Sequence, residues 1–160
     1  MMSLMIFLTT FLSPGHSTIV DSNKHFSHTL ATDVSPGQIW DVWINVGQWH
    51  TWDSGLQEAK LDGPFQEGSK GNLTSLEGRR SKFKIVAFDE GRSYTFRTPL
   101  LFSSLYVKRY LSTNNGKTTL THEVIFKGLT AGLFAKKFGP RFRQMLPAVM
   151  HKVVEKAEKL

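Results

Sequence analysis

The stretch VSPGQIWDVWINVGQWHTWD, residues 34–53, contains all four tryptophans of the chain and decides how the rest is interpreted. Near its start, Ser35 suits a helix N-cap, Pro36 the first helical position and Gln38 the third position of a capping box. Apolar residues then recur at helical spacing from Ile39, which predicts one apolar helical face that ends at the glycine of INVGQ. The following QWHTWDS predicts a second, short helical turn.

His50 and Asp53 are the side chains of this stretch that could carry chemistry. On a short helix they would share a face, as a base and its orienting carboxylate do. No serine or cysteine nucleophile motif and no HExxH-type metal spacing accompanies them. We therefore interpret Asp53 as a local hydrogen-bonding residue at the end of a helical turn, and His50 as a partly exposed residue between two packed tryptophans.

Strand patterns lie on both sides of the tryptophan stretch. Residues 24–36 alternate and are rich in Phe, Thr, Leu and Val, which predicts a strand before the first helix. Downstream, Asn115-Gly116 is the strongest hairpin signal, because a type I′ turn needs positive φ at both positions. The spacing of turns without intervening helices predicts an antiparallel meander. Its strands are expected at residues 55–62, 69–77, 80–89, 92–100, 103–113 and 117–127.

After Gly128 the apolar period becomes helical again and continues to the C-terminus. Gly139-Pro140 is expected to break or kink this helix early and Pro147 to bend it, since proline removes a hydrogen bond and clashes with the preceding turn. Residues 129–142, before the main helix, alternate large apolar and basic side chains, so they could form a mobile gate or an interfacial anchor. The order of elements gives an α+β class.

Composition sets outer limits on the chemistry. The 160 residues suffice for one domain with its own core, and the absence of cysteine excludes disulfides, thiolate metal sites and a cysteine nucleophile. The formal net charge is +7, and residues 129–160, with seven basic and two acidic side chains, carry +5 of it. Such a segment could attract nucleic acid or an anionic membrane surface, but a helix with a solvated basic face is the simpler interpretation.

Residues 1–23 are expected to lie outside the domain, which we place at residues 24–160. The run LMIFLTTFL (4–12), followed by a small-x-small pattern, resembles a signal peptide, although no Lys or Arg precedes it. An N-terminal extension is the alternative. The sequence therefore favours a cytoplasmic location, or a secreted or periplasmic one if residues 1–17 are a signal peptide.

Four motifs recur in order over about residues 25–158: VSPGQIWDVWINVGQWHTWD (34–53), LDGPFQEGSKGNL (61–73), FKIVAFDEGRSYTF (83–96) and TTLTHEVIFKG (118–128). With the amphipathic helix that follows, they resemble the START-like (SRPBCC) superfamily, and within it the polyketide cyclase/dehydrase and lipid-transport family. The resemblance implies a helix-grip fold, a curved seven-stranded antiparallel sheet around a long C-terminal helix. It also implies a cavity between sheet and helix for apolar or amphipathic ligands, with the W-x-x-W-D region closing one end of the fold.

Alternation along the predicted strands identifies polar side chains that would face this cavity. His122 shares a face with apolar residues of its strand, which makes it the best single candidate for a ligand-contacting or proton-transferring group; a buried histidine satisfied by a neighbour is the alternative. Arg109 would turn inward with the Leu/Val face of its strand, unless a bulge leaves it in solvent. An inward arginine needs an acidic or carbonyl partner, from the protein or from a carboxylate-bearing ligand. Tyr94 could place a hydroxyl at the cavity wall.

The leading hypothesis is a module that binds or transports a small lipid or an aromatic, polyketide-like molecule, without metal, cofactor or nucleic acid. Any contact with a membrane would be a weak surface contact. One alternative is a cyclase/dehydrase-type enzyme in which His122, Tyr94 or Arg109 handles protons or enolate charge. Another is a co-chaperone-like protein-interaction domain, from a further resemblance. The predicted ligand-contacting residues are Tyr94, Phe96, Arg109, His122, Val124, Phe126, Phe138, Met145 and Val149.

Overall fold

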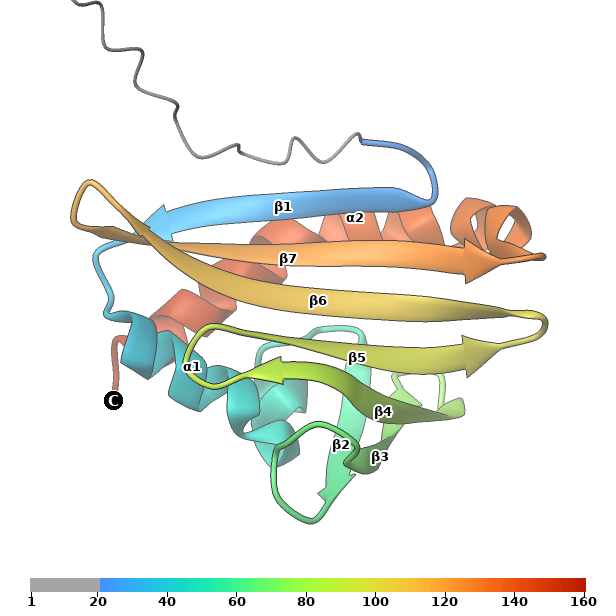
Figure 1. Ribbon diagram of the computed structural model, residues 1–160, viewed down its shortest axis with the longest axis horizontal. Coiled ribbons are helices and arrows are strands. Elements are labelled where there is room, and N and C mark those ends of the chain that lie inside the picture. Colours follow the sequence, from blue (N-terminus) through green and yellow to red (C-terminus); the bar gives the residue numbers. More distant parts are fainter. Residues whose placement is uncertain (1–20) are drawn as a thin grey trace, which may run out of the picture.

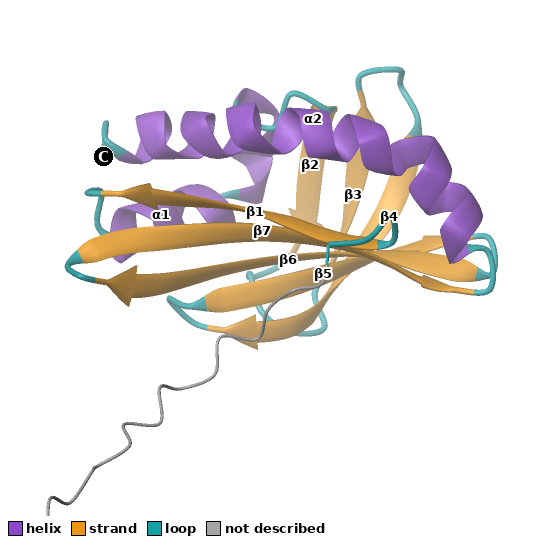
Figure 2. Ribbon diagram, turned by 90° about the horizontal axis from the view of Figure 1, so that it is seen from above, coloured by secondary structure: helices purple, strands orange, loops and turns teal. Residues whose placement is uncertain are grey.

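The computed structural model describes residues 21–160, which form one sheet flanked by helices on its concave side (Figures 1 and 2). The apolar run 4–12 and the cleavage-like pattern after it lie outside the described residues. The elements in chain order are β1 (His25–Thr32), α1 (Pro36–Ile44), the 3-10 helix η1 (Val46–Thr51), β2 (Leu56–Asp62), β3 (Lys70–Ser75), β4 (Arg80–Asp89), β5 (Ser93–Leu100), β6 (Ser103–Asn114), β7 (Lys117–Gly128) and α2 (Ala131–Ala157).

The sheet has the strand order β1-β7-β6-β5-β4-β3-β2, with every neighbouring pair antiparallel. Register shifts interrupt β2 near its start and β4 near its middle, and such irregularities bend a strand and increase its twist. Figure 2 shows β2 and β3 crossing under α2 while β1 and β7 run along it. The predicted α+β helix-grip class is confirmed, and the six strands after the tryptophan stretch match their predicted bounds within two residues.

The first helix begins as the sequence predicts. The Ser35 hydroxyl accepts a hydrogen bond from the Gln38 backbone N–H at 3.3 Å, and the Gln38 side-chain oxygen accepts one from the Ser35 N–H at 3.4 Å. This reciprocal pair satisfies two donors that helix formation would leave free. The predicted end is slightly wrong: α1 stops at Ile44, and Gly47 lies inside η1 instead of ending the first helix.

Of the two effects expected at Gly139-Pro140, a break or a kink, the break does not occur, whereas the helix does bend early (Figure 2). α2 continues from Ala131 to Ala157 through both Pro140 and Pro147. The physical reason is tertiary packing: buried side chains on both sides of Pro140, including Ala135 and Leu146, belong to one apolar cluster and offset the hydrogen bond that proline removes. Figure 2 shows the first turns of α2 bending away from the axis of the rest, and residues 131–142 are part of α2, not a gate before it.

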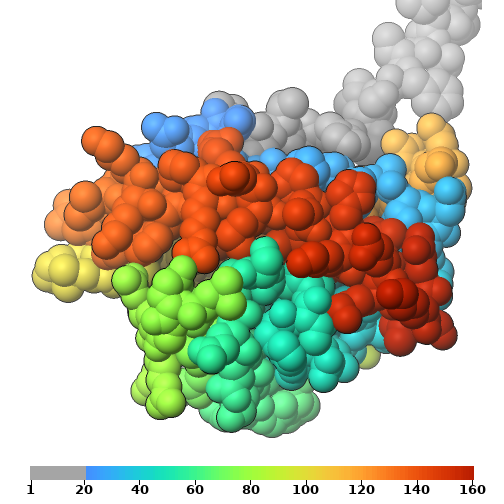
Figure 3. Space-filling view, turned by 180° about the vertical axis from the view of Figure 1, so that it is seen from behind, coloured from blue at the N-terminus to red at the C-terminus, as the bar shows by residue number. Residues whose placement is uncertain are grey.

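The interior is divided into two apolar clusters. The larger one contains the four tryptophans, the central strands and the C-terminal half of α2; the smaller one joins Phe26, Val124 and Phe126 to the N-terminal half of α2. Figure 3 shows α2 lying across the face opposite that of Figure 1, above the β2–β4 end of the sheet. Between residues 21 and 160, no helix combines the length and apolar character that crossing a membrane requires.

Candidate functional site

A row of polar side chains crosses the concave face of the sheet. His28 on β1, His122 on β7, Arg109 on β6 and Tyr94 on β5 are consecutive register partners, so their side chains lie side by side on the same face. The neighbouring row on one side is apolar, with Phe26, Val124, Val107, Phe96 and Ile85. The leucines 30, 120 and 111 form the row on the other side. An ionisable row is therefore enclosed between two apolar rows.

Arg109 is the central residue of this row. Its side chain faces inward and is only 2% exposed, which resolves the alternative that a bulge would place it in solvent. The guanidinium carbon lies 4.8 Å from the ring centroid of Trp52 and 5.0 Å from that of Trp49. The rings of Tyr94 and Phe96 follow at 5.6 Å each. Four aromatic rings thus surround a buried cation, an arrangement that favours positive charge through the ring quadrupoles.

The polar partners of Arg109 satisfy its guanidinium only in part. Nη1 donates to the Tyr94 hydroxyl at 2.5 Å, but Nε reaches His122 Nδ1 only at 3.5 Å. Nη2 lies 4.0 Å from Asp53 Oδ2, beyond hydrogen-bond distance. A guanidinium carries five N–H donors in a fixed fork, so one short and one long hydrogen bond leave most of its capacity free. Arg109 therefore keeps N–H donors that find no acceptor among residues 21–160.

Asp53 is held beside Arg109 by the turn after η1. Its backbone N–H donates to the Trp49 carbonyl at 2.8 Å, and its Oδ1 accepts from the Gly55 N–H at 3.0 Å, which directs Oδ2 toward the guanidinium. The side chain is 19% exposed. Burial raises the pKa of this carboxyl, and the nearby Arg109 charge opposes that rise without cancelling it. The carboxylate is therefore an incomplete counter-ion for Arg109.

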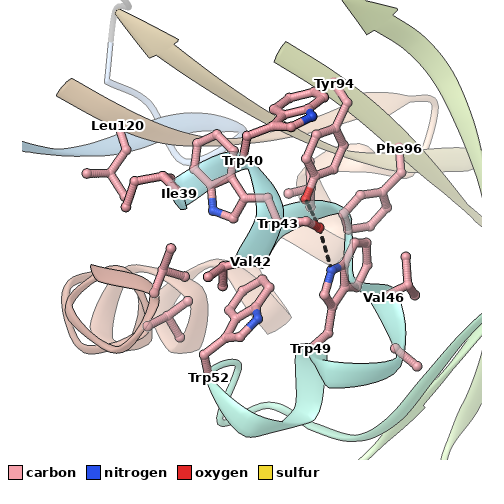
Figure 4. Packing of buried hydrophobic residues seen from close by; sticks show 14 of the residues in the cluster. Ile39, Trp40, Val42, Trp43, Val46, Trp49, Trp52, Tyr94, Phe96 and Leu120 are labelled. Atoms are coloured by element: carbon pink, nitrogen blue, oxygen red, sulfur yellow. Dashed lines mark hydrogen bonds between the residues drawn. The ribbon is translucent and has the colours of Figure 1, made fainter. Parts of the chain in front are cut away.

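The scaffold beside Arg109 consists of three aromatic residues, Trp43, Trp49 and Tyr94, which are shown in Figure 4. Trp49 Nε1 donates to the Trp43 carbonyl at 2.8 Å, and the Tyr94 hydroxyl, which accepts from Arg109, donates to the same carbonyl at 3.5 Å. Trp49 also stacks on Tyr94 and Phe83. Burial raises the pKa of Tyr94, so its hydroxyl stays protonated and acts as a donor. Trp52, the residue that follows η1, has a buried Nε1 that makes no hydrogen bond to any of the described residues.

His122 completes the site as a neutral imidazole. Its burial lowers its pKa well below the ordinary value of 6.5, and the charge of Arg109 and the neighbouring His28 act in the same direction. Nδ1 faces the Nε–H of Arg109 and must therefore act as the acceptor, which places the imidazole proton on Nε2. A neutral histidine beside an arginine offers a base and a cation in one small space.

The structure brings the three predicted catalytic candidates, Tyr94, Arg109 and His122, together, but not the whole predicted ligand-contacting set. Tyr94, Phe96 and Val149 belong to the larger apolar cluster, with Met145 packed against it, whereas Val124 and Phe126 belong to the smaller cluster, where Phe138 packs. The expected contacts with a ligand remain predictions for all nine residues. His50 is exposed, as expected from the sequence.

Three residues of the site were missed by sequence reasoning. Asp53 was interpreted as a local turn residue, which its bond to Gly55 supports, but it also faces Arg109. Trp49 and Trp52 were expected to close one end of the sheet; they are 1% exposed each and lie over the concave face against Arg109. The requirement that an inward arginine find an acidic partner was the signal that could have led to Asp53.

Two open depressions flank η1 on the surface. One, of about 420 Å³, is lined by residues of the α1–η1 junction, by β2 and by Phe65; the other, of about 590 Å³, lies between Gly47, His50, β2 and Arg80. None of the predicted ligand-contacting residues lines either depression. The rings of Trp49 and Trp52 lie against Arg109, so a molecule that reaches the guanidinium from this side has to displace them. Among residues 21–160, no three His, Cys, Asp or Glu side chains gather in a way that could hold a metal ion.

Acid sensitivity is a direct consequence of the buried neutral histidine. Below pH 6.5 the unfolded chain binds a proton at His122 that the folded chain does not, so stability falls with pH by up to about 1.4 kcal/mol per pH unit from this group. The raised pKa of Asp53 acts oppositely at lower pH, where the folded chain takes up its proton first and gains stability. When the pH is lowered from about 7.5 to about 5.5, the free energy of unfolding should fall for both proteins. We expect the fall for His122→Gln to be smaller than that for the unmodified chain by roughly 1–2 kcal/mol.

Urea unfolding followed by circular dichroism at the two pH values measures this difference. His50→Gln, which removes an exposed histidine, is the matched control and should keep the slope of the unmodified chain. If the free energy of unfolding changes with pH equally in His122→Gln and in the unmodified chain, His122 is not held neutral in the folded protein.

The curved sheet, the long covering helix and the enclosed polar row define a helix-grip domain with a potential ligand site on its concave face. The family model of polyketide cyclase/dehydrase and lipid transport matches residues 24–158, and the chain belongs to this family. No curated protein matches the sequence.

Solved structures with the same fold share little sequence with this chain. A hypothetical protein, jhp0584, from Helicobacter pylori is 8% identical with a TM-score of 0.72, covering 96% of this chain and 99% of that one. The di-domain ARO/CYC StfQ from the steffimycin biosynthetic pathway is 9% identical with a TM-score of 0.68, covering 86% of this chain and 52% of that one. Ara h 8.0201 is 16% identical with a TM-score of 0.60, covering 82% and 97%. At these identities the likeness concerns the fold alone.

Proposed function

We propose that the protein binds a small amphipathic molecule whose apolar body lies along the concave face of the sheet and whose acceptor oxygens meet Arg109. The observation that carries this proposal is the buried guanidinium with one short hydrogen bond and a counter-ion at 4.0 Å. Membership of a family described as polyketide cyclase/dehydrase and lipid transport supports a ligand of this kind. Such sites combine apolar walls with a few placed polar groups.

The rows beside Arg109 explain why the ligand should be amphipathic. A carboxylate or enolate oxygen would take up the free N–H donors of Arg109, and the flanking Phe, Val and Leu side chains would contact a hydrocarbon or aromatic body. The Met145 side chain, half-buried and next to Gly55, is flexible enough to adapt to a guest when the cover moves. Ligand binding therefore requires rearrangement of the aromatic cover over the site.

A matched pair of ligands tests the proposal. Palmitic acid and cetyl alcohol share their hydrocarbon chain and differ in the oxygen group. Binding can be followed by tryptophan fluorescence, because all four tryptophans lie in residues 40–52. We expect the acid to bind more tightly, and Arg109→Met to weaken the acid about tenfold or more while leaving the alcohol within about threefold, since a charge-assisted hydrogen bond contributes roughly 1.5–3 kcal/mol.

The exposed Arg97, which bonds to Ser104, provides the control variant Arg97→Met, expected to bind both compounds as the unmodified chain does. Native mass spectrometry of the purified protein should in addition detect a co-purified amphipathic molecule. Absence of a co-purified molecule together with no response to either compound would contradict ligand binding altogether. If Arg97→Met weakens the binding of palmitic acid as much as Arg109→Met does, Arg109 is not the residue that binds the carboxylate.

Catalysis of the cyclase/dehydrase type is a second candidate, favoured by one specific observation. Arg109 lies within 3.5 Å of both the Tyr94 hydroxyl and His122 Nδ1, which places a neutral imidazole next to a cation. That combination could remove a proton next to a carbonyl and stabilise the enolate oxygen. Incubation with a synthetic poly-β-keto thioester distinguishes the two functions: loss of one water mass supports catalysis, and recovery of the unchanged compound supports binding alone.

A further inference from the structure

An apolar tip lies at the end of the molecule where β5 meets β6 and β7 meets α2. Among the described residues, six large apolar side chains are more than half exposed, and four of these are in the tip. The β5–β6 turn contributes Leu101, 67% exposed, and Phe102, 71% exposed; Leu129 after β7 is 89% exposed, and Leu133 in the first turn of α2 is 67% exposed. Figure 3 shows this turn, in yellow, beside the start of α2, in orange.

Backbone hydrogen bonds join the two halves of the tip. The Leu129 N–H donates to the Phe102 carbonyl at 2.9 Å, and the Thr130 hydroxyl donates to the Leu101 carbonyl. The Thr130 hydroxyl also lies 3.0 Å from that of Ser103. The four apolar side chains are therefore presented by one connected piece of structure and project together from the end of the sheet.

The β5–β6 turn has apolar residues, although its backbone conformation at Phe102 favours asparagine or glycine. Phe102 adopts a positive φ of 53°, a conformation that asparagine and glycine adopt at lower cost, as the Asn115-Gly116 turn at the other end of β6 illustrates. An exposed Leu-Phe pair contributes nothing to the core and does not suit the turn. Strain of this kind, combined with exposure, indicates that the side chains have a role outside the folded chain.

The strands and helix that form the tip are rich in positive charge, and of their cations Arg141 and Arg143 are paired with Glu77 and Asp21. The sequence from residue 91 to residue 154 contains eleven lysines and arginines but a single carboxylate, Glu123, which is buried and bonded to His25 at 2.5 Å. Lys127, Lys136 and Lys137 are exposed and close to the tip in sequence, and none of them takes part in an ion pair among the described residues. The cations at this end are thus free to meet an external anionic surface.

We propose that the apolar tip inserts shallowly into the surface of an anionic lipid bilayer, with the three lysines at the level of the headgroups. Protruding apolar side chains with adjacent lysines have the two properties that interfacial binding requires. A second copy of the chain is a poorer occupant, because it would bring the same positive charge against this end. The proposal uses the surface of the molecule and does not depend on what binds near Arg109.

Vesicle sedimentation of the full chain tests the proposal. We expect binding to vesicles of phosphatidylcholine with about a third phosphatidylglycerol, weak binding to phosphatidylcholine alone, and loss of binding as salt rises. The double variant Phe102→Ser/Leu129→Ser should weaken partitioning about tenfold or more, because two exposed apolar side chains no longer enter the interface. Lys136→Gln/Lys137→Gln should weaken it by about fivefold per lysine.

Matched controls lie at the other end of α2. Leu160→Ser removes an apolar side chain with the same exposure as Phe102, 71%, and Lys152→Gln/Lys159→Gln removes two exposed lysines. All variants retain residues 1–20, so differences between them report on the tip, and circular dichroism confirms that each is folded. Equal effects of tip and control variants would overturn the proposal, as would no binding to the anionic vesicles. A dimer seen by light scattering without lipid and abolished by Phe102→Ser/Leu129→Ser would also overturn it, in favour of self-association.

Discussion

Replacement of Trp49 by alanine is expected to lower the free energy of unfolding by about 4 kcal/mol. Its ring lies within 6.5 Å, centroid to centroid, of those of Trp52, Phe83, Tyr94 and Phe96, at 6.1, 5.6, 6.4 and 5.4 Å. Its indole N–H satisfies the Trp43 carbonyl, and its face contacts the Arg109 guanidinium. The alanine variant therefore loses packing, a buried hydrogen bond and part of the cover of a buried charge.

Urea unfolding followed by far-ultraviolet circular dichroism measures this loss without using tryptophan signals. Trp49→Phe keeps an aromatic ring and loses the hydrogen bond, so it should fall between the alanine variant and the unmodified chain. Gln48→Ala, at an exposed neighbouring position of η1, should change stability by less than about 0.5 kcal/mol. A loss below about 1.5 kcal/mol for Trp49→Ala would show that the aromatic cluster repacks around the gap.

The second large effect is expected at Arg109, where two substitutions should differ in outcome. Arg109→Ala should cost about 3–5 kcal/mol, because it leaves a gap among four aromatic rings and removes the partner of Asp53 and Tyr94. Arg109→Met fills the space with an apolar chain and removes a buried charge whose hydrogen bonds are incomplete. It too removes the partner of Asp53 and Tyr94, but it leaves no gap, so it should be more stable than Arg109→Ala by about 2 kcal/mol.

Urea unfolding at neutral pH of the two variants, side by side, separates a structural role from a binding role. A stable Arg109→Met variant that no longer distinguishes palmitic acid from cetyl alcohol would assign the guanidinium to ligand recognition. If Arg109→Met is as unstable as Arg109→Ala, the polar contacts of Arg109 with Tyr94, His122 and Asp53 stabilise the fold, and a role of the guanidinium in ligand binding alone is contradicted. Arg97→Met, on the exposed face of β5, serves as the control in this comparison too.

The fold could be predicted closely because its signals are local. The capping box at Ser35 and Gln38 forms as expected, and the positive φ values at Asn115 and Gly116 belong to the predicted hairpin turn. Turn residues and period-two alternation act over a few neighbours, so they can be recognised without knowing the rest of the structure. Of the break or kink predicted at Gly139-Pro140, the break does not occur, because contacts between α2 and distant strands outweigh the local preference of proline to break a helix.

The site could be predicted only in part. Alternation placed Tyr94 and His122 on the inner face, because side-chain direction in a strand follows from sequence position, and it left Arg109 either inward or turned to solvent by a bulge. Their arrangement in one row depends on the registers of β5, β6 and β7, and Asp53 joins them from a turn far away in the sequence. Trp49 and Trp52 likewise reach Arg109 from η1 and its end. No local sequence pattern predicts contacts between residues that lie so far apart along the chain.

The sequence by itself determined the α+β class, the order and approximate bounds of the elements, and the inward direction of Tyr94 and His122, since each of these follows from contacts between near neighbours. The tertiary structure alone decided that Arg109 lies among four aromatic rings with Asp53 as an incomplete counter-ion. It also decided that Leu101, Phe102, Leu129 and Leu133 meet at one end. Both depend on strand register and on the docking of helices across the sheet, which bring together residues that are far apart along the chain.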